Sequence, residues 1–233
     1  MKKSICSAVI LLSLTLSSSI ASGQSRETRD VRGFTSVGFG ISGGLFIKIG
    51  PEFNLVMEGD RDVLEDIETI VRDGKLIIRK RNWHPSFNNE RVTINLTMPE
   101  LKGVGVSGSG KVEILDNIVA DDLDFGVSGS GKLITSGLDV DRFVCGISGS
   151  GDVILGATGG IDRGEISISG SGGFSGEGIQ IDDLEVHISG SGNCRCRAGD
   201  NLKAYISGSG NITYSGNPRV DAKVSGSGHV RSK

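Results

Sequence analysis

The feature that most constrains this chain is a short phrase, SGSG, which occurs seven times between residues 106 and 229. Each copy follows a valine or an isoleucine, and the spacing between successive copies is 18 to 21 residues. Glycine and serine are typical of flexible linkers, but a linker has no reason to recur at a fixed period between branched apolar residues. A period near twenty with strand-like flanks indicates one coil of a parallel β-solenoid. The first serines of the phrases are Ser107, Ser128, Ser148, Ser169, Ser189, Ser207 and Ser225.

The residues around each phrase alternate in a way that predicts which face is buried. Side chains of a strand point to opposite faces in turn, so positions at odd offsets from the first serine share a face. The positions one and three before it, and five after it, are apolar in every copy. This face is therefore predicted to point inward, and the serines outward. The two glycines of each phrase have inward parity, and we expect them at a narrow corner of the coil that has no room for side chains. They are Gly108, Gly110, Gly129, Gly131, Gly149, Gly151, Gly170, Gly172, Gly190, Gly192, Gly208, Gly210, Gly226 and Gly228.

The pattern as a whole predicts an all-β protein: a parallel β-helix, or solenoid, of about seven SGSG coils over residues 101–233. Residues 24–100 are predicted to form N-terminal strands and one short helix that cap an open end of the stack. Within them, Gly40–Leu45 is a degenerate copy of the phrase. The apolar residues between Val63 and Val71 fit an amphipathic helix that ends at Gly74. Residues 24–233 are thus predicted to be a single domain.

Residues 1–23 have the pattern of a secretory signal peptide. Two lysines precede an apolar run from Ala8 to Leu16, and small residues follow at Ala21 and Gly23. The run is too short to span a bilayer. The sequence therefore predicts export to the periplasm, the outer-membrane surface or the extracellular space.

Charge and cysteine content exclude several classes of function. The net charge is −3, which gives no reason to expect nucleic acid as a partner. Three cysteines remain after removal of the signal peptide, and this odd number is no disulfide framework. By register Cys145, Cys194 and Cys196 point inward, so we expect small buried apolar side chains. No cofactor is predicted.

A column of acidic residues lies seven positions before the first serines. The simplest interpretation is that each carboxylate starts a turn by accepting hydrogen bonds from backbone amides. A ladder of bound cations is the alternative, which the sequence leaves open. The column consists of Glu100, Asp121, Asp141, Asp162, Asp182 and Asp200, with Pro218 in the last coil.

The order of these motifs resembles a known family. An FxxV strand is followed by a GD-helix-GxLxI unit, a strand that ends at Pro99, the serial SGSG coils and YSGNP at Tyr214–Pro218. Over about residues 33–218 this is similar to the head GIN domain family, described as "putative auto-transporter adhesin" and widespread in Bacteroidetes. The resemblance implies a right-handed parallel β-helix in an exported protein. It implies no catalytic residue.

No set of residues has the spacing of a catalytic or metal site. We therefore expect a non-enzymatic surface or periplasmic interaction module, with adhesion as its candidate role, whose partner is a protein or a glycan at the cell surface. The alternative is a carbohydrate-binding or carbohydrate-active solenoid, a polysaccharide hydrolase or lyase, using acids such as Asp121, Asp122 and Asp124 or Asp182, Asp183 and Glu185. The aromatic side chains expected to be available to a partner are in the 80–90 loop. That loop carries Trp83, His84 and Phe87. A homo-oligomer is a further alternative.

Overall fold

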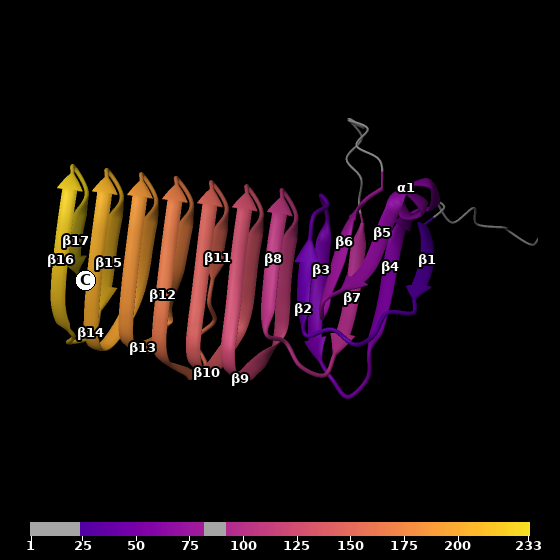
Figure 1. The fold of residues 1–233 in the computed structure, drawn as a ribbon, viewed down its shortest axis with the longest axis horizontal. Coiled ribbons are helices and arrows are strands. Elements are labelled where there is room, and N and C mark those ends of the chain that lie inside the picture. Colours follow the sequence, from indigo (N-terminus) through magenta and orange to yellow (C-terminus); the bar gives the residue numbers. More distant parts are fainter. Residues whose placement is uncertain (1–23, 82–91) are drawn as a thin grey trace, which may run out of the picture.

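The computed structural model describes residues 24–81 and 92–233, and nearly all of this backbone is β-structure (Figure 1). The strands stack into a parallel β-solenoid of about six turns, close to the seven coils expected from the sequence. Figure 1 shows a rod with the N-terminal strands at one end and the C-terminal strands at the other. The all-β solenoid prediction is confirmed.

The repeat section consists of long strands that bend around the coil and so contribute to more than one face. Successive first serines are paired in register, as in Ser107↔Ser128 and Ser128↔Ser148. We call the sheet formed by the segments that lead into each SGSG phrase the phrase face. The strands are β8 (Gly103–Gly108), β9 (Lys111–Gly129), β10 (Lys132–Gly149), β11 (Asp152–Ile154), β12 (Gly160–Gly170), β13 (Gly173–Gly190), β14 (Asn193–Gly208), β15 (Asn211–Ser215), β16 (Arg219–Gly226) and β17 (His229–Ser232).

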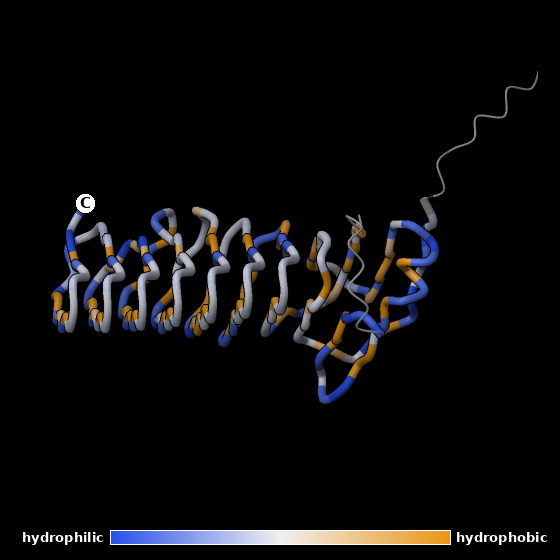
Figure 2. The backbone as a smooth tube through the Cα atoms, turned by 90° about the horizontal axis from the view of Figure 1, so that it is seen from above, coloured by the Kyte–Doolittle hydropathy of each residue, from blue (hydrophilic) through white to orange (hydrophobic). Residues whose placement is uncertain are grey.

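The inward face predicted by alternation is the core of the solenoid. The residues directly before the first serines, from Val106 to Ile206, are at most 3% exposed. Phenylalanines extend the core along the rod: the ring centroids of Phe125 and Phe143 are 5.4 Å apart, and those of Phe143 and Phe174 are 6.3 Å apart. Figure 2 shows apolar residues recurring at similar places in successive coils. Burial of these side chains supplies the main driving force for stacking the coils.

The cysteines lie in this core, as predicted. Cys145, Cys194 and Cys196 are free thiols that are at most 1% exposed. Burial raises the pKa of the Cys145 thiol. The pKa of Cys194 is also raised well above its ordinary value, by a hydrogen bond with Cys196 and by burial. The thiols therefore stay protonated and act as small apolar side chains.

The two glycines of each phrase differ, which corrects the expectation that both face inward. The second glycine is buried: a Cβ on Gly131 would lie 2.6 Å from Val106 Cγ1 and 2.8 Å from the Gly110 carbonyl oxygen. The first glycine ends its strand with a positive φ, between 104° and 129° in the seven copies. A Cβ on Gly149 would meet the carbonyl oxygen of Gly129, in the preceding coil, at 2.6 Å. Simple alternation fails here because this left-handed turn interrupts the extended backbone.

The N-terminal strands begin as part of the solenoid and then change to antiparallel pairing. β2 pairs in parallel with β8 and β3 with β9, so that Gly40–Leu45 takes the place of the phrase in an additional coil, as predicted. Beyond this coil, β4 is antiparallel to β1 and β7, and β5 is antiparallel to β6. The elements are β1 (Gln24–Arg29), β2 (Ser36–Phe39), β3 (Gly44–Ile49), β4 (Asn54–Asp60), α1 (Arg61–Asp66), β5 (Ile67–Arg72), β6 (Lys75–Lys80) and β7 (Thr93–Met98).

The predicted helix is shorter than expected. α1 ends at Asp66, and Ile67, Ile70 and Val71 lie in β5, which turns through Asp73–Gly74 into β6. β-branched side chains favour a strand over a helix, and β6 offers β5 a full antiparallel partner. The helix contacts β1, β4 and β5 and buries Leu64, so it still covers this end of the stack.

Candidate functional site

The residues chosen from the sequence as a partner-binding loop lie outside the described residues. Trp83, His84 and Phe87 all fall in the segment 82–91, so their role stays a prediction. In the described part of the chain, the candidate site is an open groove of about 1140 Å³ on the phrase face. It runs along the rod from β2 and β6 to β16.

The floor of the groove is a row of glycines two positions before the first serines, and here an outward side chain is missing. Gly38 pairs with Gly105, Gly105 with Gly126, and Gly126 with Gly146, and Ser167 comes next in the row. We call Gly38, Gly105, Gly126 and Gly146 the floor glycines. With Ser167 they span about 19 Å, because neighbouring strands are about 4.8 Å apart.

In the middle of the floor, the fold does not require glycine. A Cβ on Gly126 or on Gly146 would meet no atom within 4 Å, and neither residue has a positive φ. Glycine in a strand interior lowers stability, and it often marks a place where a ligand or another backbone approaches closely. The open space above these two residues is therefore unexplained by packing within the chain.

One end of the floor is closed by a stack of side chains from β13, β14 and β16. The rings of His187 and Tyr205 are 4.7 Å apart with an interplanar angle of 17°, and the Lys223 ammonium is 5.6 Å from the Tyr205 centroid. Glu185 Oε1 lies 2.7 Å from His187 Nε2 and fixes the ring. Since Tyr205 covers one face of the imidazole, the other face is directed along the row toward Ser167 and the floor glycines.

The opposite end is closed by basic side chains from β6. Lys75 lies across the floor: a Cβ on Gly38 would be 3.0 Å from its Cε, and a Cβ on Gly105 would be 3.7 Å from its Nζ. Arg79 also lines this end, and its Nε donates a hydrogen bond to Glu68 Oε2 at 3.0 Å. Among the described residues that line the groove, the lysines and the arginine are charged and none of the others is an acid.

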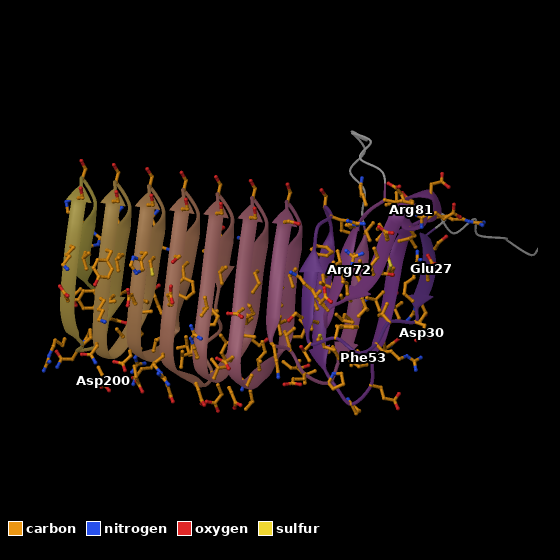
Figure 3. All side chains as sticks on the ribbon, viewed as in Figure 1. Glu27, Asp30, Phe53, Arg72, Arg81 and Asp200 are labelled. Atoms are coloured by element: carbon orange, nitrogen blue, oxygen red, sulfur yellow. The ribbon has the colours of Figure 1, made fainter. Side chains whose placement is uncertain are left out.

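One long rim of the groove is polar. On one side stand the first serines of the phrases, which are exposed, as at Ser107, Ser128 and Ser148. Their hydroxyls repeat at the strand spacing, and each can both donate and accept a hydrogen bond. Figure 3 also shows a regular row of oxygen-tipped side chains just beyond the ends of the strand arrows, where the chain leaves this face. The next outward column, four positions before the serines, includes Asp124 and Glu165, which do not line the groove.

Of the acids considered as catalytic candidates, Asp182, Asp183 and Glu185 are engaged with neighbouring side chains. Asp183 Oδ1 accepts a hydrogen bond of 2.6 Å from the Asn201 amide, and Asp182 Oδ1 accepts one of 2.8 Å from Gln180. Glu185 contacts His187 and lies 4.0 Å from the Lys203 ammonium. Asp183 and Glu185 line a smaller groove of about 600 Å³. These two acids contact side chains of the next coil, whereas Asp182 contacts Gln180 within its own strand.

The acidic column lies where the chain turns between two faces. Val140 pairs with Ile161 and Arg142 with Arg163, while Asp141 and Asp162 stand at the step between these pairs. Asp182 accepts its hydrogen bond from a side-chain amide, not from the backbone amide expected for a turn. Within residues 24–81 and 92–233, no three His, Cys, Asp or Glu side chains are arranged to hold a metal ion.

The sequence contained a signal for the groove that alternation analysis of the inward face overlooked. Gly105, Gly126 and Gly146 occupy the same outward position in three consecutive copies of the repeat. One end wall carried the same signal, because His187, Tyr205 and Lys223 also stand two positions before a first serine. Lys75 did not, because it pairs with Ser36 and its side chain reaches the floor from the neighbouring column.

Taken together, these features define a parallel β-solenoid that bears an elongated surface groove. A family model described as "Putative auto-transporter adhesin, head GIN domain" matches residues 33–218. The chain belongs to this head GIN domain family.

Solved structures share the fold. A "putative adhesin" from Bacteroides fragilis has a TM-score of 0.86 and 22% identity, over 91% of this chain and 98% of that chain. A "putative lipid binding protein" from Parabacteroides distasonis has a TM-score of 0.70 and 23% identity, over 91% and 98%. A "putative adhesin" from Parabacteroides merdae has a TM-score of 0.71 and 21% identity, over 91% and 97%. None of the curated proteins compared with the chain matches it.

Proposed function

We propose that the chain is a non-enzymatic, exported interaction module that holds its ligand in the groove of the phrase face. The observation that carries this proposal is the open space above Gly126 and Gly146, which packing within the chain does not explain. A rigid solenoid presents such a groove without rearrangement, so little conformational entropy is lost on binding. The partner would be a protein or a glycan at the cell surface or in the periplasm.

The family and its solved relatives support the coarse part of this proposal. The family is described as an adhesin, and two of the structures with the same fold carry that description. The third is named for lipid binding, which makes a lipid the second ligand class to examine. Export rests on the predicted signal peptide, and no helix in the described residues is long and apolar enough to cross a membrane.

Absence of catalysis is part of the proposal. Asp182 and Asp183 are each hydrogen-bonded to a side-chain amide, whereas a hydrolase or lyase needs an acid and a base aimed at one substrate bond. Release of reducing sugars from purified polysaccharides, lost in Asp183→Asn, would contradict the proposal.

The test of the groove is a binding screen with two valine variants. The chain from residue 24 onward is applied to purified polysaccharides and to vesicles of phosphatidylglycerol. Gly126→Val fills the floor, whereas Gly160→Val places the same side chain in β12 outside the groove, where a Cβ would also meet nothing within 4 Å. We expect binding to be lost in Gly126→Val and kept in Gly160→Val. Binding that survives in both variants would place the site elsewhere.

Self-association is measured on the same samples. Light scattering gives the mass of the chain in solution and shows whether a homo-oligomer forms. If Gly126→Val changed that mass, a second copy would be the occupant of the groove.

A further inference from the structure

We propose that the occupant of the groove is a linear acidic oligosaccharide, which lies along the floor glycines with a carboxylate beside Lys75. This inference rests on the proposed function and adds the chemical class of the ligand. Three properties of the groove lead to it: its dimensions, the chemical groups of its walls, and the charge of its ends.

The dimensions match one polymer chain. The floor lies between two outward columns that are four residues apart, about 13 Å between backbones at about 3.3 Å per residue. Side chains on both columns narrow this space, and the floor is about 19 Å long. A single chain of six-membered sugar rings can lie lengthwise along such a floor.

The groove exposes mostly carbon, from the glycine backbone and from side chains such as Ile77 and Val224 near its ends, and its hydrogen-bonding groups stand along the serine rim. The aliphatic residues beneath the middle of the floor, such as Val127 and Ile147, point into the core and are 2% exposed. An acyl chain gains most from burial against apolar side chains, and over this middle section the chain offers few. Sugar hydroxyls, in contrast, find the hydroxyls of Ser107, Ser128 and Ser148 repeated along one rim.

The glycine floor suits the flat C–H surface of a sugar ring, and the end wall gives a terminal sugar a surface to pack against. The His187 side chain is 45% exposed, its ring is held by Glu185, and one face is free toward the floor. Aromatic faces of this kind present a rigid contact surface to the edges and faces of ligands.

The positive charge at the two ends of the groove favours an acidic ligand. The chain as a whole has a net charge of −3, yet the charged side chains that line this groove are basic, and the acids of the neighbouring column, such as Asp124 and Glu165, are not among them. No ion pair of Lys75 is found in the described part of the chain, and its ammonium lies over the floor. A local basic site on an acidic protein attracts anions and sets their orientation. A carboxylate on the sugar chain would form an ion pair with the Lys75 ammonium.

The experiment is isothermal titration of the chain from residue 24 onward with four probes. Tetramers of galacturonate and of mannuronate carry the carboxylates, cellotetraose is the neutral tetramer, and oleate is the anionic acyl chain. We expect at least one uronate tetramer to bind about tenfold more tightly than cellotetraose, and this advantage to fall as salt is raised.

Three variants locate the contacts. Lys75→Gln is expected to weaken uronate binding about fivefold and to leave the neutral tetramer unchanged. Its matched control is Lys132→Gln, since Lys132 lies outside the groove, 3.6 Å from Asp152. Gly126→Val is expected to abolish binding of every probe that enters the groove.

The outcomes separate this inference from the function it rests on. The acidic oligosaccharide is overturned if neither uronate tetramer binds, if cellotetraose binds as tightly, or if Lys75→Gln changes nothing. It is also overturned if oleate binds in preference and is excluded by Gly126→Val, although the groove would then remain the binding site. Uronate binding that persists in Gly126→Val contradicts both proposals.

Discussion

Two sets of glycines, a few residues apart on the same strands, have opposite reasons to be glycine. The second glycines of the phrases, such as Gly131 and Gly151, would place a Cβ only 2.3–2.6 Å from the preceding coil. In the middle of the floor, Gly126 and Gly146 would place a Cβ in open solvent. The fold therefore requires glycine at Gly131 and Gly151. It does not require glycine at Gly126 and Gly146, so these two residues must be explained by something outside the fold.

The comparison teaches how function can be recognised in a repeat protein. A repeat forces the same residue into many coils for structural reasons, so recurrence alone says nothing about binding. An outward glycine that recurs without a steric need is different, because each copy forgoes a side chain that would stabilise its strand. This reason applies to Gly126 and Gly146, and it is why we propose that the middle of the floor has a function.

The largest expected difference between a core position and a position on the groove floor is in the rate at which a cysteine thiol reacts. Gly126→Cys would place a thiol in the open groove, whereas the native Cys145 is buried. Because only thiolate reacts, and burial raises the pKa of Cys145, we expect the introduced thiol to react at least about a thousandfold faster. Titration with a chromogenic disulfide reagent, with and without denaturant, measures both rates. Rapid labelling of the parent chain would contradict the assignment of its thiols to the core.

The same thiols predict how stability depends on pH. The pKa of Cys145 is raised in the folded state, so folding keeps a proton that the unfolded chain loses above its ordinary value of about 8.5. The contribution is fully present below that pH, and stability should fall as pH rises beyond it. Denaturation midpoints at several alkaline pH values test this, with Cys145→Ala as the control that should flatten the curve.

The next largest effect is expected at the first glycine of a phrase, where the strand ends in a left-handed turn. Gly149→Ala forces an L residue to a φ of 110° and brings its Cβ within 2.6 Å of the Gly129 carbonyl oxygen. We expect a loss of about 1–3 kcal/mol in the free energy of unfolding. Urea denaturation followed by circular dichroism gives the value. An unchanged midpoint would mean that this turn is not under steric constraint.

The smallest effect is expected on the rim. Ser148→Ala removes an exposed hydroxyl from the outward column and should change stability by less than about 0.5 kcal/mol. The same denaturation series measures it. A loss as large as that of Gly149→Ala would show that the serine column supports the fold and is not free to bind a ligand.

Much of this architecture could be predicted from sequence because burial imposes a period of two on a strand. That rule assigned the inward residues and placed Cys145, Cys194 and Cys196 in the core. It failed at the first glycine of each phrase, since parity counting assumes an extended backbone and a positive φ interrupts it. It also failed after Asp66, where spacing suggested a helix but pairing with β6 favoured a strand.

The candidate site was less predictable than the fold. Its floor could have been found by asking which outward positions recur as glycine. His187 could have been placed in the same way, since it too stands two positions before a first serine. Lys75 could not, because it lies in the β5–β6 hairpin, outside the repeat, and only the pairing of β6 with β2 in the folded solenoid lets its side chain cross the floor.

The most direct test of this account is a pair of valine substitutions in the same turn of the solenoid. Gly131→Val should lose about 3 kcal/mol of unfolding free energy, because its side chain would overlap Val106 and the Gly110 carbonyl oxygen. Gly126→Val should gain about 0.5 kcal/mol, because valine suits an open strand position better than glycine. Urea denaturation of both variants gives the difference. Equal losses at the two positions would contradict the claim that the fold requires one set of glycines and not the other.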